Sequence, residues 1–108
     1  IMPVIRIDYD NEKIGDKEVL VLSNAIQKIV SETTNIEDVF VYANSSHIKV
    51  KVAPIEIFIQ MSDHKITDLD KLVEEIKQKL SNWKKENNFS YSINMSFIPM
   101  KWKIEIGI

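Results

Sequence analysis

The sequence contains no cysteine and a single arginine, Arg6, among its 108 residues. Without cysteine the chain has no disulfide, no thiolate metal ligand and no thiol nucleophile. Two separated histidines, His47 and His64, do not make a metal site by themselves, so we expect no metal site. One arginine and a formal net charge of −2 also disfavour binding to nucleic-acid phosphates.

Glycine and proline are scarce as well, with 2 and 3 copies, while hydrophobic residues make up 44% of the chain. This composition excludes a disordered or linker-rich chain. No apolar run approaches the ~20 residues of a membrane span, and the start lacks the layout of a signal peptide. We therefore expect one domain covering residues 1–108, with no membrane segment and a cytoplasmic location.

Hydrophobic periodicity predicts the elements of the first half. Residues 3–9 alternate, with Ile5, Ile7 and Tyr9 on one side, as in a strand with one buried face. From Asp16 to about Thr33 the spacing becomes helical, and residues 39–43 and 48–52 are predicted as two further strands.

The second half follows the same order. Alternation predicts strands over 55–60, 89–97 and 102–106, and helical spacing predicts a helix over 67–85. Thr67, with Asp70 three residues later, resembles an N-terminal capping pair for that helix.

The two halves superimpose when the sequence is shifted by fifty residues. Ile5 then falls on Ile55, and Ile26 falls on Ile76, so the strand and helix periods both agree. We expect two pseudo-repeats, about 3–53 and 54–108, with shared architecture; identical residues are too few to show common ancestry.

Each predicted strand-helix-strand unit places its two strands parallel. Two such units predict an α+β fold of tandem β-α-β units, with a four-stranded mixed sheet and both helices on one face. The other face of the sheet would carry apolar and charged residues together: Val4, Arg6, Phe40, Glu56 and Phe58. Because that face is too apolar to remain in water, we expect an oligomer, with 48–52 and 102–106 as edge strands that pair with a neighbouring subunit.

The segment MPVIRI and the doubled pattern at this length resemble the tautomerase superfamily. The two-unit length is similar to the branches of macrophage migration inhibitory factor and 5-carboxymethyl-2-hydroxymuconate isomerase. The stretches APIEIFIQMS and FIPM more closely resemble another bacterial family of that superfamily. The resemblance covers essentially the whole chain and implies a homotrimer.

The resemblance also implies acid–base chemistry at Pro3, with a small enol or 2-keto acid as substrate and no cofactor. A free N-terminal proline is a secondary amine, whose pKa burial and a nearby cation would lower toward neutrality. Such a base moves a proton in keto–enol isomerisation. Arg6 is the candidate cation, and it would also bind a substrate carboxylate.

The remaining family positions match unevenly. Lys13 stands where single-unit tautomerases have an arginine before the first helix, and Phe40 replaces their second arginine. Asn94 matches an active-site asparagine, and Tyr91 lies near the position of a pocket tyrosine. The resemblance thus implies substrate binding by Arg6, Lys13, Tyr91 and Asn94. Each also has a structural alternative: a salt bridge for Arg6, a solvated loop for Lys13, the core or an interface for Tyr91, and a turn or strand end for Asn94.

One expectation concerns the form of the chain with Ile1 and Met2, and two alternatives to an isomerase stay open from the sequence. With Ile1 and Met2 attached, the Pro3 nitrogen is a tertiary amide without a basic lone pair, so that form is expected to be inactive. A non-catalytic oligomeric binding or interaction protein of the same fold would fit the missing arginine at Phe40. An unrelated ferredoxin-like domain would have the same order of strands and helices.

Overall fold

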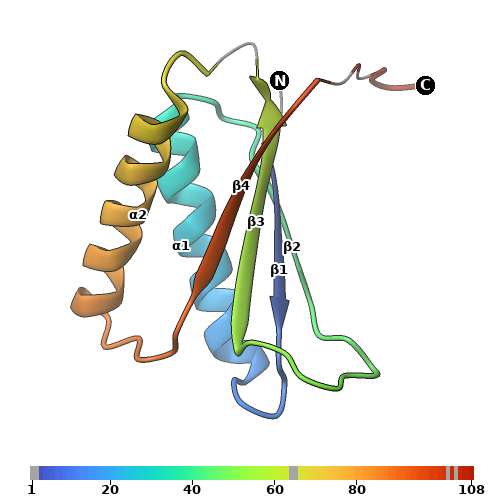
Figure 1. Ribbon diagram of the computed structural model, residues 1–108, viewed down its shortest axis with the longest axis vertical. Helices are drawn as coiled ribbons and strands as arrows, with labels where there is room; N and C mark the ends of the chain where they lie inside the picture. The colour runs from blue at the N-terminus through green and yellow to red at the C-terminus, as the bar shows by residue number, and fades with distance from the viewer. Residues whose placement is uncertain (1–2, 64–65, 102, 104) are drawn as a thin grey trace.

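The computed structural model describes residues 3–63, 66–101, 103 and 105–108. Its elements form two consecutive β-α-β units. The elements are β1 (Val4–Tyr9), α1 (Asp16–Thr34), β2 (Phe40–Asn44), β3 (Ile55–Ser62), α2 (Leu69–Glu86) and β4 (Asn94–Met100). Both helices lie side by side on one face of the sheet (Figure 1).

The strands form one mixed sheet in the order β2-β1-β3-β4. Within each unit the two strands are parallel, whereas β1 and β3 pair antiparallel and join the units at the centre of the sheet. This arrangement confirms the predicted α+β class with two helices on one face.

The core lies between the sheet and the helices. Successive strand side chains point to opposite faces, so every second residue of β1 and β3 faces the helices. Ile5, Ile7, Ile57 and Ile59 are fully buried on that face. They pack against the apolar faces of the helices, where Leu22, Val30, Ile26, Ile76 and Leu80 are buried.

Both helices begin with a local hydrogen bond that satisfies an exposed backbone N–H. In α1 the Gly15 N–H donates to Glu18 Oε2 at 2.8 Å, and in α2 the Lys71 N–H donates to Asp68 Oδ1 at 3.1 Å. The predicted Thr67 cap is therefore wrong by one residue. A carboxylate at Asp68 accepts the N–H and also interacts favourably with the helix dipole.

Residues 48–52 form no strand in the single chain, because this segment has no strand partner among the described residues. Its predicted pairing with a neighbouring subunit stays a prediction. Val50 is fully exposed, and Lys49 points inward to bond Asp10 instead. Alternation of side chains describes an extended segment, but a strand also needs a neighbour for its backbone groups.

The last predicted strands also differ from the structure. Strand β4 begins at Asn94, five residues later than predicted, because Phe89 packs beneath the end of α2. The Phe89 ring centroid lies 5.1 Å from that of Trp83 and 5.3 Å from that of Tyr91, so the alternation here reflects an aromatic cluster. In the predicted strand 102–106, residues 102 and 104 lie outside the described residues, and the other three are in no strand.

The face of the sheet away from the helices carries three rows of paired side chains. The rows are Phe40-Val4-Gln60-Ile98, Tyr42-Arg6-Phe58-Ser96 and Asn44-Asp8-Glu56-Asn94. We call this surface the open face. It contains the five residues predicted for it and changes from apolar at the start of β1 to acidic at its end. Among the described residues, no helix is long and apolar enough to cross a membrane.

Candidate functional site

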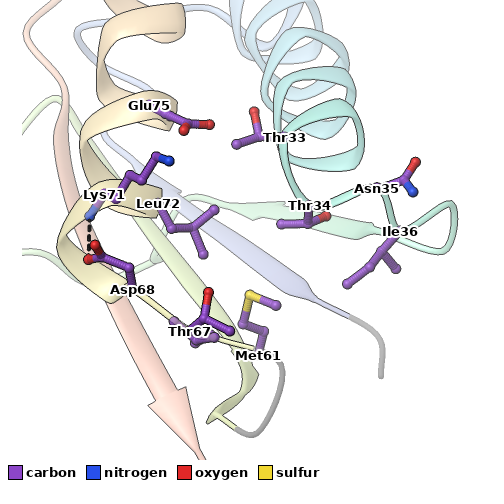
Figure 2. Close-up of a pocket in the computed structure, with 11 residues that line it drawn as sticks. Thr33, Thr34, Asn35, Ile36, Met61, Thr67, Asp68, Lys71, Leu72 and Glu75 are labelled. Atoms are coloured by element: carbon purple, nitrogen blue, oxygen red, sulfur yellow. Dashed lines mark hydrogen bonds between the residues drawn. The ribbon is translucent and has the colours of Figure 1, made fainter.

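A cavity of about 560 Å³ lies where the end of α1, the end of β3 and the start of α2 meet (Figure 2). It is lined by residues from these elements and their adjoining loops: Thr33, Thr34, Asn35, Ile36, Met61, Ile66, Thr67, Asp68, Lys71, Leu72 and Glu75. Its volume is within the range of small-molecule sites. We call it the helix-end cavity.

Pro3 lies at the same end of the sheet as the helix-end cavity. Its side chain is fully buried, and its carbonyl oxygen accepts a hydrogen bond from the Phe40 N–H at 3.1 Å. Val4 pairs with Gln60, so one further step along the antiparallel register places Pro3 opposite Met61. Pro3 does not itself line the cavity, but its neighbour Met61 does.

Several polar side chains around the cavity already have partners in the chain. The Thr34 hydroxyl donates to the Val30 carbonyl at 2.7 Å, and the Thr33 hydroxyl accepts from Lys79 Nζ at 2.9 Å. Asp68 caps α2. These bonds fix the side chains that shape the wall of the cavity and use part of their hydrogen-bonding capacity.

Arg6 lies on the open face and not in the helix-end cavity. Its Nε is 3.4 Å from Asp8 Oδ2, and its guanidinium carbon lies 4.6 Å from the centroid of the Phe58 ring. The side chain is 51% exposed. In one chain, therefore, Arg6 interacts with Asp8 and Phe58, and its predicted contact with a substrate stays a prediction.

The other three predicted site residues lie at the opposite end of the sheet from Pro3. Lys13 Nζ is 3.9 Å from Asp10 Oδ2, in the loop that follows β1. Asn94 begins β4, and Tyr91 packs on the aromatic cluster below α2. A single chain does not bring these residues to Pro3, so a site that uses all of them would draw on more than one chain.

Sequence reasoning did not find the buried ion pair at that opposite end. The Asp10 side chain is 8% exposed, and its Oδ1 lies 3.1 Å from Lys49 Nζ. Lys49 Nζ also donates to Asn11 Oδ1 at 2.7 Å and Ser45 Oγ at 3.3 Å. No sequence motif joins Asp10 to Lys49, because the two residues lie 39 positions apart along the chain.

These contacts change two pKa values at this end of the sheet. The Glu12 N–H, bonded to Asp10 Oδ1, and then Lys49 lower the pKa of Asp10, against a smaller opposing effect of burial. The Tyr9 hydroxyl donates to Asp16 Oδ1 at 2.8 Å, and this bond raises the pKa of Tyr9.

The helix-end cavity was also absent from the sequence prediction. Its lining residues carry no motif, and the segment from Thr67 onward was predicted only as an amphipathic helix. The cavity arises because two helix ends and a strand end meet without filling the space between them. Only the packing of distant segments could show it.

No protein-family model matches the sequence, and no curated protein matches it significantly. Solved structures do match the fold. A malonate semialdehyde decarboxylase superimposes with a TM-score of 0.70 at 6% identity, covering 97% of this chain and 92% of that one. A macrophage migration inhibitory factor-like protein from Entamoeba histolytica gives 0.59 at 17% identity, covering 96% and 94%.

A 5-carboxymethyl-2-hydroxymuconate delta-isomerase is similar as well, with a TM-score of 0.63 at 11% identity over 98% of this chain and 89% of that one. These proteins share one architecture despite very low identity. The chain therefore has the fold of the tautomerase superfamily, as the resemblance implied, and the ferredoxin-like alternative is not supported.

Proposed function

We propose that the form of the chain beginning at Pro3 is a tautomerase-like isomerase that needs no cofactor and acts on a small enol or 2-keto acid. The observation that carries this proposal is the position of Pro3. It is buried at the start of β1, next to the one strand residue, Met61, that lines the helix-end cavity. The similarity to decarboxylase and isomerase structures supports the same class of protein.

The proposed reaction moves one proton and leaves the composition of the substrate unchanged. The Pro3 amine takes the proton of the enol hydroxyl, and the oxygen becomes a carbonyl as the C=C electron pair takes a proton at carbon from the Pro3 ammonium. The amine then returns to its neutral state. Burial disfavours the protonated ammonium, so a buried proline nitrogen suits a base.

We further propose that the protein assembles as a homotrimer through the open face. Phe40 and Tyr42 are exposed there, and Phe58 is only half-buried beneath Arg6. Apolar side chains grouped in this way favour a covered surface. A fused 4-OT of similar fold, with a TM-score of 0.63, is described as an asymmetric trimer.

In such a trimer, residues from the far end of one chain could meet Pro3 of another. Arg6, Lys13, Tyr91 and Asn94 are then substrate-binding candidates that reach the site from a neighbouring chain. This arrangement would reconcile the separation of these residues in one chain with the roles that the resemblance implies.

The test compares three forms of the protein in an assay that follows ketonisation of phenylenolpyruvate. We expect turnover from the form that begins at Pro3. A form with Ile1 and Met2 attached and a form with Pro3→Ala should be slower by about 10²-fold or more, the usual contribution of a general base. Circular dichroism and sedimentation confirm that the three forms fold and assemble alike. Equal, negligible rates from all three would reject the enzymatic proposal.

The alternative is a non-catalytic oligomeric binding protein of the same fold. One observation favours it: Arg6 is already paired with Asp8 and Phe58, and Phe40 occupies the place of a second arginine. A stable trimer without turnover on enols or 2-keto acids would support this alternative.

A further inference from the structure

Lys71 is the single cation among the described residues that line the helix-end cavity. It lies in the first turn of α2, where its backbone N–H is held by Asp68. Figure 2 shows its side chain extending along α2 toward Glu75. The Lys71 amine is thus placed at the cavity by a helix whose start is fixed.

Three other cations among the described residues have partners within the chain. Lys79 Nζ donates to the Thr33 hydroxyl, Lys49 bonds Asp10, and Arg6 pairs with Asp8. In the part of the chain that the structure describes, the Lys71 amine has no hydrogen bond and no ion pair within 4 Å. It can therefore accept an anion without first breaking an internal bond.

Four apolar side chains line the cavity together with the polar ones: Ile36, Met61, Ile66 and Leu72. Leu72 lies beside Lys71 on α2, whereas Met61 belongs to β3 and is the residue opposite Pro3 in the sheet register (Figure 2). A ligand that contacts both Lys71 and Met61 has an anionic group at one end and an apolar group at the other. Its apolar end would face the strand end near Pro3.

From these observations we infer that Lys71 binds the carboxylate of an aryl or alkyl 2-keto acid, or of its enol, in the helix-end cavity. The inference rests on the proposed function and adds the residue that binds the substrate carboxylate. An ammonium and a carboxylate form a charge-assisted hydrogen bond, which is stronger than a neutral one.

Glu75 provides a second test, in which the expected effect on carboxylate binding has the opposite sign. It lines the same cavity, and in the described structure its carboxylate has no partner, so its negative charge acts against an incoming carboxylate. Removing the charge of Lys71 should weaken carboxylate binding, whereas removing the charge of Glu75 should strengthen it.

The experiment uses the form beginning at Pro3 and phenylenolpyruvate. Lys71→Gln should lower kcat/KM about tenfold, mainly through KM, as expected for a hydrogen bond to a charged group. Glu75→Gln should raise kcat/KM severalfold. Lys77→Gln, an exposed lysine of α2 that does not line the cavity, is the matched control for the same loss of charge and should have no effect. The difference between Lys71→Gln and Lys77→Gln should shrink at high salt.

A binding measurement separates this inference from the proposed function. Phenylpyruvate and its methyl ester are titrated into each variant and followed by NMR. Lys71→Gln should weaken binding of the acid but not of the ester, and Lys71→Arg should retain binding of the acid. Binding that depends on Lys71 in a protein without turnover would support the inference and reject the isomerase. Equal binding and kinetics for Lys71→Gln and Lys77→Gln, or failure of the acid to bind at all, would overturn the inference.

Discussion

At the end of the sheet where β1 finishes, which we call the filled end, Asp10 is surrounded by groups of its own chain. At the end where β1 begins, a cavity of about 560 Å³ lies between the ends of the two helices. The first end joins the β1–α1 loop to the segment 45–52 through Lys49. The second end is bounded by Met61 and by Lys71, whose amine has no partner among the described residues. Figure 1 shows these two ends at the bottom and the top of the sheet.

The difference indicates which charged groups stabilise the fold and which are available to a ligand. A buried carboxylate with several donors has its bonding capacity used within the chain, and removing a partner leaves it unsatisfied. A cation at the rim of a cavity, without a partner among the described residues, contributes little to the fold. From charge alone, Asp10, Lys49 and Lys71 could not be ranked by their contribution to stability. Their surroundings in the structure show that Asp10 and Lys49 bond each other, whereas Lys71 is available to a ligand.

The largest loss of stability should come from truncating a buried side chain of the core at the filled end. Ile55 and Met61 are both buried, on the same face at opposite ends of β3. We expect Ile55→Ala to lower the free energy of unfolding by about 3–4 kcal/mol, because it leaves a void in a packed core. Met61→Ala should lower it by about 2 kcal/mol, since Met61 already borders a cavity. Urea denaturation measures both, and equal losses would contradict the difference between the two ends.

A smaller loss is expected from breaking the ion pair of the filled end. Lys49→Met removes the side chain that donates to Asp10, Asn11 and Ser45. The midpoint of urea unfolding should fall, by less than for Ile55→Ala. Combining Lys49→Met with Asp10→Asn should recover part of the loss, because the carboxylate no longer lacks its partner. A purely additive double variant would show that the pair does not interact.

Lowering the pH should remove the stabilisation that the ionised Asp10 carboxylate contributes. The pKa of Asp10 is lowered from its ordinary value of 3.8, so the folded state binds this proton less readily than the unfolded state. The stabilisation is therefore fully present above about pH 4 and is lost as the pH falls through the pKa of the folded state. The stability difference between the original protein and Asp10→Asn should shrink below pH 4. A difference that stays constant down to pH 2 would contradict this.

The smallest effect is expected at Lys13. Its amine is 3.9 Å from Asp10 and its side chain is 55% exposed, so solvent screens the pair. Lys13→Gln should leave the unfolding midpoint almost unchanged, in contrast to Lys49→Met. If Lys13 binds substrate in a neighbouring chain, kcat/KM for an enol acid should fall without a change in stability. A large loss of stability would show that Lys13 belongs to the filled end after all.

Sequence reasoning succeeded where one period ran through a whole element. The isoleucines of β1 and β3 and the apolar positions of α1 and α2 predicted both helices and three of the four strands closely. It failed over 89–93, where the alternation reflects the aromatic cluster around Phe89. Over 48–52 the single chain has no strand, Lys49 bonds Asp10, and the predicted pairing with a neighbouring subunit stays a prediction. Alternation of every second residue shows to which face each side chain points, but it does not identify a partner strand.

The candidate site was less predictable than the fold. Pro3 was named from the opening segment and lies at the cavity end, but Lys71 carried no signal in the sequence. Arg6 lies on the open face with Phe58, as the alternation predicted, and its predicted contact with a substrate at Pro3 stays a prediction. Nearness along a strand does not place two side chains on the same face.

By itself the sequence determined the tandem β-α-β order and which residues face the core, since both follow from local periods of two and 3.6 residues. It also excluded thiol chemistry through the absence of cysteine. The tertiary structure alone decided that Asp10 meets Lys49 and that a cavity opens between Met61 and Lys71. Both features bring together segments that lie far apart in the sequence or belong to different elements. They depend on how helix ends and strand ends pack together in space.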